Sequence, residues 1–451
     1  MKVKPVIAIF DIGKTNKKIF LFDEHYRIVF EKTSRFAEIV DEDNFPCEDL
    51  DSLQQFIFAS LTEIIGLKQL KIKAINFSGY GASFVLLGED GKLVAPLYNY
   101  LKPYPEELLK EFYAEYGGKE NFSLQTASPA LASLNSGLQL YRLKQEKPEL
   151  FSRVKYALHL PQYLSFLLTG EYCSDLTSIG CHTAMWDFER NQYHQWIQKE
   201  GIEAKLAPIE PANKTYSAQS GGNYPIGIGL HDSSAALIPY LVNFTEPFVL
   251  ISTGTWCISL NPFNQTPLTN EELNSDCLCY MQYQGKPVKA SRLFSGFEHE
   301  QQVRRIADHF KCDADFFANL NFDPAIINKL QSKHSKGINF ADRDLSDFDN
   351  ENEAYHQLVR DLVRAQLSST QLVLKGTSVK RIFVDGGFSK NSVFMHLLAA
   401  TFPAMEVFAA SMAQASAVGA ALVLHPEWNT KPIPNDIIEL KYYSAKQAIS
   451  L

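Results

Sequence analysis

Hydrophobic residues along the chain follow two patterns. Short apolar runs bounded by turn residues predict β-strands, whereas longer stretches with an apolar residue at every third or fourth position predict helices. The predicted strands cover residues 6–10, 19–22, 26–32, 73–78, 84–87, 154–158, 226–230, 248–252, 256–260, 381–384 and 406–409, with a hairpin over 278–290. The predicted helices cover residues 49–67, 105–116, 134–146, 161–168, 298–310, 353–375, 392–400 and 412–424.

The turn between the first two strands has unusual chemistry for a hairpin. Its sequence is Asp-Ile-Gly-Lys-Thr-Asn-Lys-Lys, over residues 11–18. Gly13 lets the backbone come close to a ligand, Thr15 and Asn16 can donate hydrogen bonds, and Asp11 can hold a hydrated cation. Donors around a glycine, beside a carboxylate, suit a metal-bound polyphosphate. The alternative is an ordinary charged hairpin.

Two further strands run into loops of small residues. Residues 79–83 (Gly-Tyr-Gly-Ala-Ser) follow a strand and form either a ligand loop or a plain tight connection. Asp232 lies where a strand gives way to a helix. On the residues alone, an N-cap role is the better interpretation of Asp232, and a general base in a cleft is the alternative.

The second half of the chain begins like the first. After a credible boundary at residues 243–247, an apolar strand leads to Thr253-Gly254-Thr255 and a second strand. This partial repeat suggests two related domains that face each other across a nucleotide. Residues 385–391 (Asp-Gly-Gly-Phe-Ser-Lys-Asn) then join a strand to a helix. Glycines there let a flat ring or a phosphate approach backbone amides, although a tight connection is again the alternative.

Several segments have less specific patterns. Residues 175–188 are polar and aromatic, and their aromatic residues favour a place in the core over a site. His194 and Trp196 are expected on a helix surface. Residues 333–350 are expected to form a surface loop or insertion, and about the last 25 residues are expected to be peripheral.

Composition narrows the possible functions. The chain has 451 residues, which predicts about two or three domains. Its net charge of -8, with no basic run beyond the first turn, argues against a nucleic-acid partner. No apolar stretch has membrane-spanning length and no signal peptide is evident, so a cytoplasmic protein is expected. The seven scattered cysteines indicate reduced thiols, and their spacing argues against zinc binding.

Four motifs in order resemble those of the FGGY family of carbohydrate kinases, within the sugar kinase, actin and heat-shock ATPase superfamily. They are DIGKTNKK, GLHDSSAA, STGTW and DGGFSKN, the last followed by AQASAVGAAL, and the resemblance covers roughly residues 5–425. It implies an α/β protein of two ribonuclease-H-like (actin-like ATPase) domains with the active site in the cleft between them. Residues 1–244 would carry the sugar site and first phosphate turn, and residues 245–451 the second phosphate turn and adenosine site.

The resemblance also implies roles for individual residues. Asp11 would help to hold Mg²⁺, and Asp232 would be the catalytic base, which reverses the preference for an N-cap. ATP would contact three motifs, comprising Gly13, Thr15, Asn16 and Lys18, then Thr253, Gly254 and Thr255, then Gly386, Gly387 and Asn391. The sugar would be held by Ser78, Tyr80, Gly81, Ala82 and His231. Lys14 and Lys17 receive no role.

The implied reaction is ATP-dependent phosphorylation of a ketose hydroxyl. The chain lacks the Gly-Gln-Met-His of xylulose kinases, and its His231-Asp232-Ser233 and Ser252-Thr253-Gly254-Thr255-Trp256 stretches are closer to rhamnulose kinases. L-rhamnulose or L-fuculose is therefore favoured over xylulose, ribulose or a polyol. Two competing functions are a non-catalytic sugar or nucleotide sensor and an ATPase that acts on protein partners. A homodimer is the candidate assembly.

Overall fold

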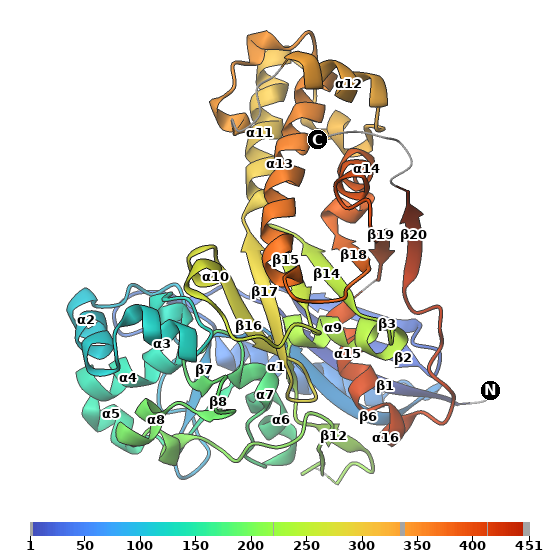
Figure 1. Cartoon of the computed structure of the whole chain (residues 1–451). Helices are drawn as coiled ribbons and strands as arrows, with labels where there is room; N and C mark the ends of the chain where they lie inside the picture. Colours follow the sequence, from blue (N-terminus) through green and yellow to red (C-terminus); the bar gives the residue numbers. More distant parts are fainter. Residues whose placement is uncertain (1–2, 220, 334–338, 413, 445–451) are drawn as a thin grey trace.

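The computed structural model describes residues 3–219, 221–333, 339–412 and 414–444. It contains two large β-sheets with a pair of helices at the junction between them, and further helices on the outer faces (Figure 1). No helix in these ranges is long and apolar enough to cross a membrane.

The first sheet is built around the central strand β1. Its order is β11–β12–β6–β1–β2–β3, and β13 also pairs with β6. Strand β1 is antiparallel to β2 and parallel to β6, so Asp11 lies opposite Lys18 on one side and Ser78 on the other. The strand bounds are β1 Lys4–Ile12, β2 Lys17–Asp23, β3 Ile28–Ser34, β6 Leu70–Gly79, β11 Thr215–Ser217, β12 Pro225–Gly227 and β13 Leu230–His231.

The second sheet repeats this arrangement. Its order is β16–β17–β15–β14–β18–β19–β20. Strand β14 is antiparallel to β15 and parallel to β18, as β1 is to β2 and β6. The repeated strand–turn–strand pattern in the sequence therefore corresponds to a repeated structure. The bounds are β14 Phe248–Thr253, β15 Cys257–Asn261, β16 Cys277–Met281, β17 Pro287–Leu293, β18 Arg381–Gly386, β19 Glu406–Ser411 and β20 Glu439–Tyr443.

Helix α9 (Asp232–Asn243) lies between the two sheets (Figure 1). Ala235 and Ile238 pack in the same hydrophobic cluster as β1 of the first sheet. Leu237 and Tyr240 pack in a different cluster with β14 of the second sheet. Because both faces are buried, the position of the first residue of α9 is fixed relative to both domains.

Helix α15 (Ala415–Val423) packs against α9 and against the first sheet, although the preceding strands belong to the second sheet. A Cβ atom on Gly419 would lie 1.8 Å from the carbonyl oxygen of Ala235, so the two helices approach too closely for any larger residue. Asn76 of β6 donates a hydrogen bond of 2.8 Å to the carbonyl of Ala420. The predicted small-residue helix thus packs tightly against a sheet, as expected.

The remaining helices cover the outer faces of the sheets and form an additional lobe. Helix α1 begins after Asp49, whose carboxylate accepts hydrogen bonds from the amides of Asp51 and Ser52. In the first half the helices are α1 Leu50–Ile65, α2 Glu106–Glu115, α3 Lys119–Gln125, α4 Ser136–Glu146, α5 Pro148–Arg153, α6 Leu160–Thr169, α7 Leu176–Ile179 and α8 Gln195–Lys199. In the second half they are α10 Asn270–Asn274, α11 Ser295–Phe310, α12 Pro324–Lys333, α13 Glu351–Leu374, α14 Ser392–Thr401 and α16 His425–Trp428.

Short strands form three further pairs, β4 Ile39–Val40 with β5 Pro46–Cys47, β7 Phe84–Leu87 with β8 Tyr156–His159, and β9 Trp186–Asp187 with β10 Gln192–Tyr193.

Several sequence predictions were wrong at the periphery. His194 and Trp196 are buried rather than on a helix surface, and Trp196 is fully inaccessible. The third strand begins at Ile28, because Tyr26 has a φ of +60° and belongs to the preceding turn. The C-terminal segment is not peripheral, since β20 completes the second sheet beside β19 and Trp428 is buried.

The segment predicted as a surface loop, residues 333–350, contributes to the core where it is described. Residues 334–338 of that segment, and residue 413 of the predicted helix 412–424, lie outside the described residues. Phe340, Leu345 and Phe348 are buried in the hydrophobic cluster that α13 and α14 share. The sequence predicted a surface loop because most of the residues around these three are polar.

The lysines of the first turn are explained by a buried ionic network. Lys17 is only 2% exposed, and its Nζ lies 2.6 Å from Glu48 Oε1 and donates to the carbonyl of Lys14. The other carboxylate oxygen of Glu48 accepts a hydrogen bond of 3.2 Å from the Tyr80 hydroxyl. Lys14 Nζ lies 2.7 Å from Glu38 and 3.8 Å from Glu48. Glu48 therefore ties the turn after β1 to the loop after β6.

Replacing Lys17 by methionine is expected to destabilise the protein, because it leaves the buried Glu48 carboxylate without its closest cation. Removing one partner of a buried ion pair costs about 3 to 5 kcal/mol. The matched control is Lys32→Met, which removes an exposed pair with Glu63 at 2.6 Å and is expected to cost less than about 1 kcal/mol. Urea unfolding of the two variants measures the difference, and equal midpoints would contradict a structural role for Lys17.

Candidate active site between the two domains

A cavity of about 250 Å³ lies between the start of α9 and the inner face of the second sheet. It brings together residues from distant parts of the chain. They are Asp232, Ser233 and Ala236 of α9, Leu250, Ser252, Ile258, Leu260, Tyr280 and Asp385 of the second sheet, and Ala415 and Ser416 of α15. Of the predicted site residues, Asp232 is the one that lines it directly.

Asp232 is the first residue inside α9, and His231 occupies the N-cap position. Its Oδ1 accepts a hydrogen bond of 2.6 Å from the amide of Ser233, while Oδ2 makes no hydrogen bond among the described residues. The Asp232 side chain is 35% exposed and lines the cavity. The surrounding protein raises the pKa of Asp232 to about 6, chiefly through burial, so the carboxylate is mostly ionised at pH 7. A carboxylate with one free oxygen suits a general base.

His231 is buried and contacts the Asp232 carboxylate. Its Nε2 lies 3.3 Å from Asp232 Oδ1 and 3.1 Å from Cys181 Sγ, and its ring stacks on Tyr280 with centroids 6.0 Å apart. Burial lowers the pKa of His231 to about 4, so the ring is neutral at pH 7. A Cβ atom on Gly81 would lie 2.9 Å from this ring. The predicted sugar loop therefore lies directly against His231.

The other residues predicted to hold a sugar are mostly buried or hydrogen-bonded within the protein. Tyr80 is buried, with its hydroxyl bound to Glu48. Ala82 has a φ of +59°, and its carbonyl accepts a hydrogen bond of 2.8 Å from Gln139. The hydroxyl of Ser78 is buried without a hydrogen-bond partner in the part of the chain that the structure describes. These residues shape the loop, and Gly81 is its point of contact with His231.

Asp11 lies at the end of β1, opposite Ser78, and accepts a hydrogen bond of 3.1 Å from the Ser416 hydroxyl. Burial, with the nearby negative charge of Asp232, raises the pKa of Asp11 to about 6. No group of three or more His, Cys, Asp or Glu residues able to hold a metal is found among the described residues. A hard cation fits here only with Asp11, water and ligand oxygens as its donors, which is the usual pattern for Mg²⁺ beside phosphates.

The first turn leaves one hydroxyl free. Thr15 is exposed, and its side chain makes no hydrogen bond to the described residues. The acceptor atoms of Asn16 are occupied, because its carbonyl accepts from the Gly13 amide at 3.0 Å and its Oδ1 accepts from Arg35 at 2.7 Å, whereas its Nδ2 donates no hydrogen bond to the described residues. Lys18 Nζ lies 3.4 Å from Gln414 Oε1. The Thr15 hydroxyl, the Asn16 Nδ2 and the neighbouring backbone amides are therefore the groups available to a ligand.

In the second turn, too, some polar groups are hydrogen-bonded within the protein and one threonine hydroxyl is free of such bonds among the described residues. The Thr253 hydroxyl donates to the Asp385 carbonyl at 2.5 Å and accepts from the Phe388 amide at 3.0 Å, so it joins β14 to the glycine turn after β18. The Gly254 amide is bound to the Trp256 carbonyl. Thr255 is exposed and has no hydrogen bond from its side chain within the described ranges. It is the counterpart of Thr15 in the second domain.

A larger cavity of about 620 Å³ begins at this second turn. It is lined by Gly254, Thr255, Gly296, His299, Glu300, Ala318, Asn319, Tyr355, Gly387, Phe388, Lys390 and Asn391. Gly386 is required by the backbone conformation and by a close neighbour, whereas Gly387 borders open space. Gly386 has a φ of +89° and its Cβ would lie 1.9 Å from the Thr253 carbonyl, whereas a Cβ on Gly387 would meet no atom within 4 Å. The open space beside Gly387 suits a nucleoside.

Asn391 helps to build this cavity through its own hydrogen bonds. Its Oδ1 accepts from the Phe394 amide at the start of α14, and its Nδ2 donates to the Tyr355 hydroxyl at 2.6 Å. Tyr355 also lies 3.0 Å from His299 Nε2. Asn391 therefore shapes the wall of the cavity, with its side chain already held by protein groups.

Sequence reasoning missed several residues that surround the base. Tyr280 and Cys181 contact His231, Ser416 contacts Asp11, and the Thr177 hydroxyl accepts a hydrogen bond of 3.0 Å from the His231 amide. Thr177 and Cys181 lie in the polar aromatic segment 175–188, for which a site was one of the two interpretations. Tyr280 and Ser416 carried no local signal, because only the folded chain brings them to the cleft.

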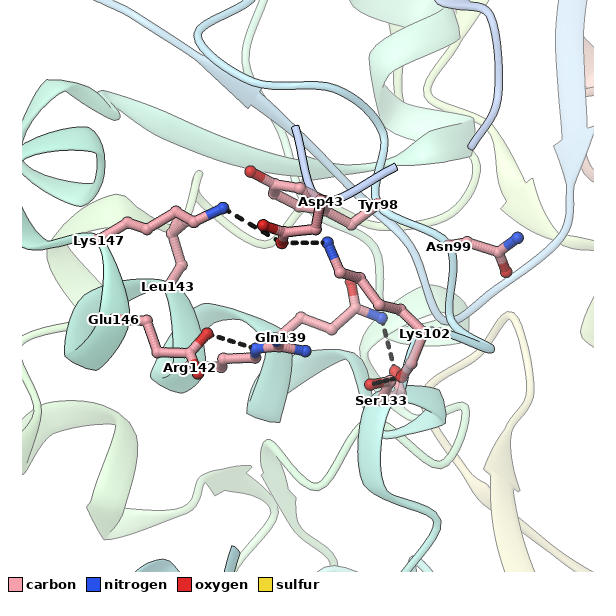
Figure 2. Close-up of a pocket in the computed structure, with 10 residues that line it drawn as sticks. All are labelled: Asp43, Tyr98, Asn99, Lys102, Ser133, Gln139, Arg142, Leu143, Glu146 and Lys147. Atoms are coloured by element: carbon pink, nitrogen blue, oxygen red, sulfur yellow. Dashed lines mark hydrogen bonds and ion pairs between the residues drawn. The ribbon is translucent and has the colours of Figure 1, made fainter. Parts of the chain in front are cut away.

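A separate small pocket is lined by residues of the first half of the chain, among them Lys102, Arg142 and Lys147 (Figure 2). Its volume is about 40 Å³, and none of the predicted site residues lines it. Its cations are paired within the protein, with Lys102 at 2.6 Å from Asp43, Lys147 at 3.5 Å from Asp43 and Arg142 at 2.6 Å from Glu146. The pocket is therefore no open anion site.

Comparisons with known proteins show what this chain is similar to. Residues 6–238 match the N-terminal domain of the FGGY family of carbohydrate kinases, and residues 245–432 match the FGGY carbohydrate kinase C-terminal domain. A rhamnulokinase of Oceanobacillus iheyensis is 23% identical over 265 residues, which cover 55% of this chain and 54% of the relative. A rhamnulokinase of Klebsiella pneumoniae is 25% identical over 297 residues, covering 60% and 58%. The chain thus spans a little over half the length of these curated relatives.

Solved structures match over nearly the whole chain. A carbohydrate kinase from Novosphingobium aromaticivorans has a TM-score of 0.81 at 23% identity, covering 98% of this chain and 95% of its own. A ligand-bound xylulose kinase from Lactobacillus acidophilus has a TM-score of 0.77 at 17% identity, with the same coverages. A Plasmodium falciparum glycerol kinase with ADP has a TM-score of 0.76 at 16% identity, covering 97% and 92%. These matches establish the two-domain fold, and together with the two domain matches they show that the chain belongs to the FGGY family of carbohydrate kinases.

Proposed function

We propose that the protein transfers the terminal phosphoryl group of ATP to a hydroxyl of a ketose. The observation that carries this proposal is the Asp232 carboxylate, which lines a cavity at the junction of the two domains and whose Oδ2 makes no hydrogen bond among the described residues. Each domain also has a turn with an exposed threonine whose side chain makes no hydrogen bond there. A nucleotide held by Thr15 and Thr255 would place its terminal phosphate between the domains, within reach of a hydroxyl bound to Asp232.

The chemistry then follows from positioning. The acceptor hydroxyl donates a hydrogen bond to Asp232, loses its proton to that carboxylate and attacks the terminal phosphorus, while the bond to the ADP oxygen breaks. Neutral His231 keeps the carboxylate oriented. Asp11 would hold Mg²⁺, which supplies neutralisation of phosphate charge when bound. The cavity lined by Gly387 would receive the adenosine.

The relatives favour a particular substrate. Both curated relatives described above are named rhamnulokinase, which supports L-rhamnulose or a similar 6-deoxyketose such as L-fuculose. The structural matches include kinases of xylulose and of gluconate, so the test covers acceptors of both kinds. An assay coupled to ADP release, run over a panel of ketoses, polyols and sugar acids, measures which acceptor is used. A protein that releases no ADP with any acceptor would be a sensor rather than an enzyme.

Replacing Asp232 by asparagine is expected to abolish transfer, because the amide cannot accept the proton of the acceptor hydroxyl. The loss of a general base reduces kcat by about 10² to 10⁴. Binding of Mg-ATP, measured by calorimetry, is expected to remain, since Asp232 is assigned to the acceptor. Turnover close to that of the wild type would remove Asp232 from the mechanism.

The two glycines after β18 give a matched pair of variants. Gly387→Val places a side chain in the open cavity and is expected to raise the KM for ATP by about tenfold or more, at an unchanged melting temperature. Gly386→Ala forces a strained φ and a clash with Thr253, and is expected to lower the melting temperature. If Gly387→Val left the KM for ATP unchanged, the nucleotide would lie elsewhere.

A further inference from the structure

Three exposed aromatic side chains from the turn before β15 and the start of α11 contact one another in a row, here called the aromatic ladder. Trp256, Phe294 and Phe297 are 40%, 40% and 39% exposed. The rings of Trp256 and Phe294 have centroids 4.5 Å apart, and Phe294 stacks on Phe297 at 4.6 Å with an angle of 17° between the planes. Large aromatic residues exposed together need an explanation, because single exposed apolar residues are common but contiguous ones mark binding sites.

The aromatic ladder adjoins the cavity that holds Asp232. Ile258 lines that cavity, and its partner on the neighbouring strand is Arg292. Residues paired across antiparallel strands lie on the same face of a sheet, so Arg292 is also on the cleft side. The Arg292 guanidinium lies 5.3 Å from the centroid of the Trp256 ring, which keeps Trp256 on this side as well.

Arg292 also locates the aromatic ladder relative to the base. Its guanidinium is held by Asp276, with contacts of 2.5 and 3.2 Å. Its charge opposes the rise that burial causes in the pKa of Tyr280 and of Cys181. Both of these residues contact His231, and Arg292 shares a sheet face with Ile258, which lines the cavity that holds Asp232.

The aromatic ladder is tied to the second turn. The amide of Phe297 donates a hydrogen bond of 3.1 Å to the Thr255 carbonyl. A Cβ atom on Gly296 would lie 1.8 Å from the Gly254 carbonyl, so this end of α11 is packed tightly against the turn. A molecule against the aromatic ladder is therefore close both to the base and to the place proposed for the terminal phosphate.

We propose that Trp256, backed by Phe294 and Phe297, is the specificity-determining wall of the acceptor site and binds the apolar face of a 6-deoxyketose. This inference rests on the proposed kinase function. Aromatic faces bind the C–H surfaces of sugars, and a methyl group at carbon 6 needs no hydrogen-bond partner there. A hydroxyl at carbon 6 would lose its water against the same rings without a replacement.

The test compares two acceptors that differ only at carbon 6. L-rhamnulose carries a methyl group there, and L-fructose is the same ketose with a hydroxyl. Trp256→Ala is expected to raise the KM for L-rhamnulose by about tenfold and to reduce its advantage over L-fructose in kcat/KM, with the KM for ATP unchanged. Trp256→Phe is expected to restore most of the preference. The control is Tyr442→Ala, which removes an exposed aromatic residue on β20 and is expected to change neither value.

Tryptophan fluorescence gives a readout that does not depend on turnover. The chain has four tryptophans, and Trp186, Trp196 and Trp428 are at most 6% exposed, so Trp256 is the one that a ligand can shield from water. L-rhamnulose is expected to shift the emission of the wild type to shorter wavelength, and to leave that of Trp256→Phe unshifted.

The outcomes separate the two proposals. A wild type that phosphorylates no ketose overturns the proposed function, and the acceptor wall with it. A wild type that phosphorylates ketoses, together with a Trp256→Ala variant of unchanged acceptor preference, overturns the wall alone. An increase in the KM for ATP with no change for the acceptors also overturns it, because the aromatic ladder would then act on the nucleotide turn.

Discussion

The burial of α9 on both faces is the constraint on which the rest of the structure depends. One face packs on the first sheet and the other on the second, and Gly419 lets α15 approach the backbone of α9. Moving α9 would open apolar surface in both domains at once. Asp232 begins this helix, so the proposed base is positioned by the core rather than by a flexible loop.

The parts of the site that could be predicted are those with local chemistry. The turns after β1 and β14 and the glycine turn after β18 were indicated by unusual residues between apolar strands, and residues of the last two, Gly254, Thr255, Gly387 and Asn391, line the larger cavity. The role of each residue inside those turns was harder to predict from the sequence. Thr253 looks like a ligand donor in the sequence, but its hydroxyl already donates to the carbonyl of Asp385, which lies far away in the chain.

The remaining errors share a physical cause. The missed core residues are apolar residues with polar neighbours in the sequence, namely Trp196, Phe340, Leu345 and Phe348. A local pattern cannot show that another element covers them. Lys17 is the opposite case, a charged residue that is buried because Glu48, brought near by folding, neutralises it. Long-range partners decide burial in both cases. Strand pairing of β20 was missed for the same reason, since its partner β19 determines it.

The path of the chain between the domains has a mechanical consequence. It passes from α9 to β14, returns from β19 to α15, and passes again from α16 to β20, so three segments connect the two sheets. A single linker would let the domains turn freely about one another. Three connections restrict the relative motion of the domains far more than one linker would, so a closing motion has to bend all three segments together.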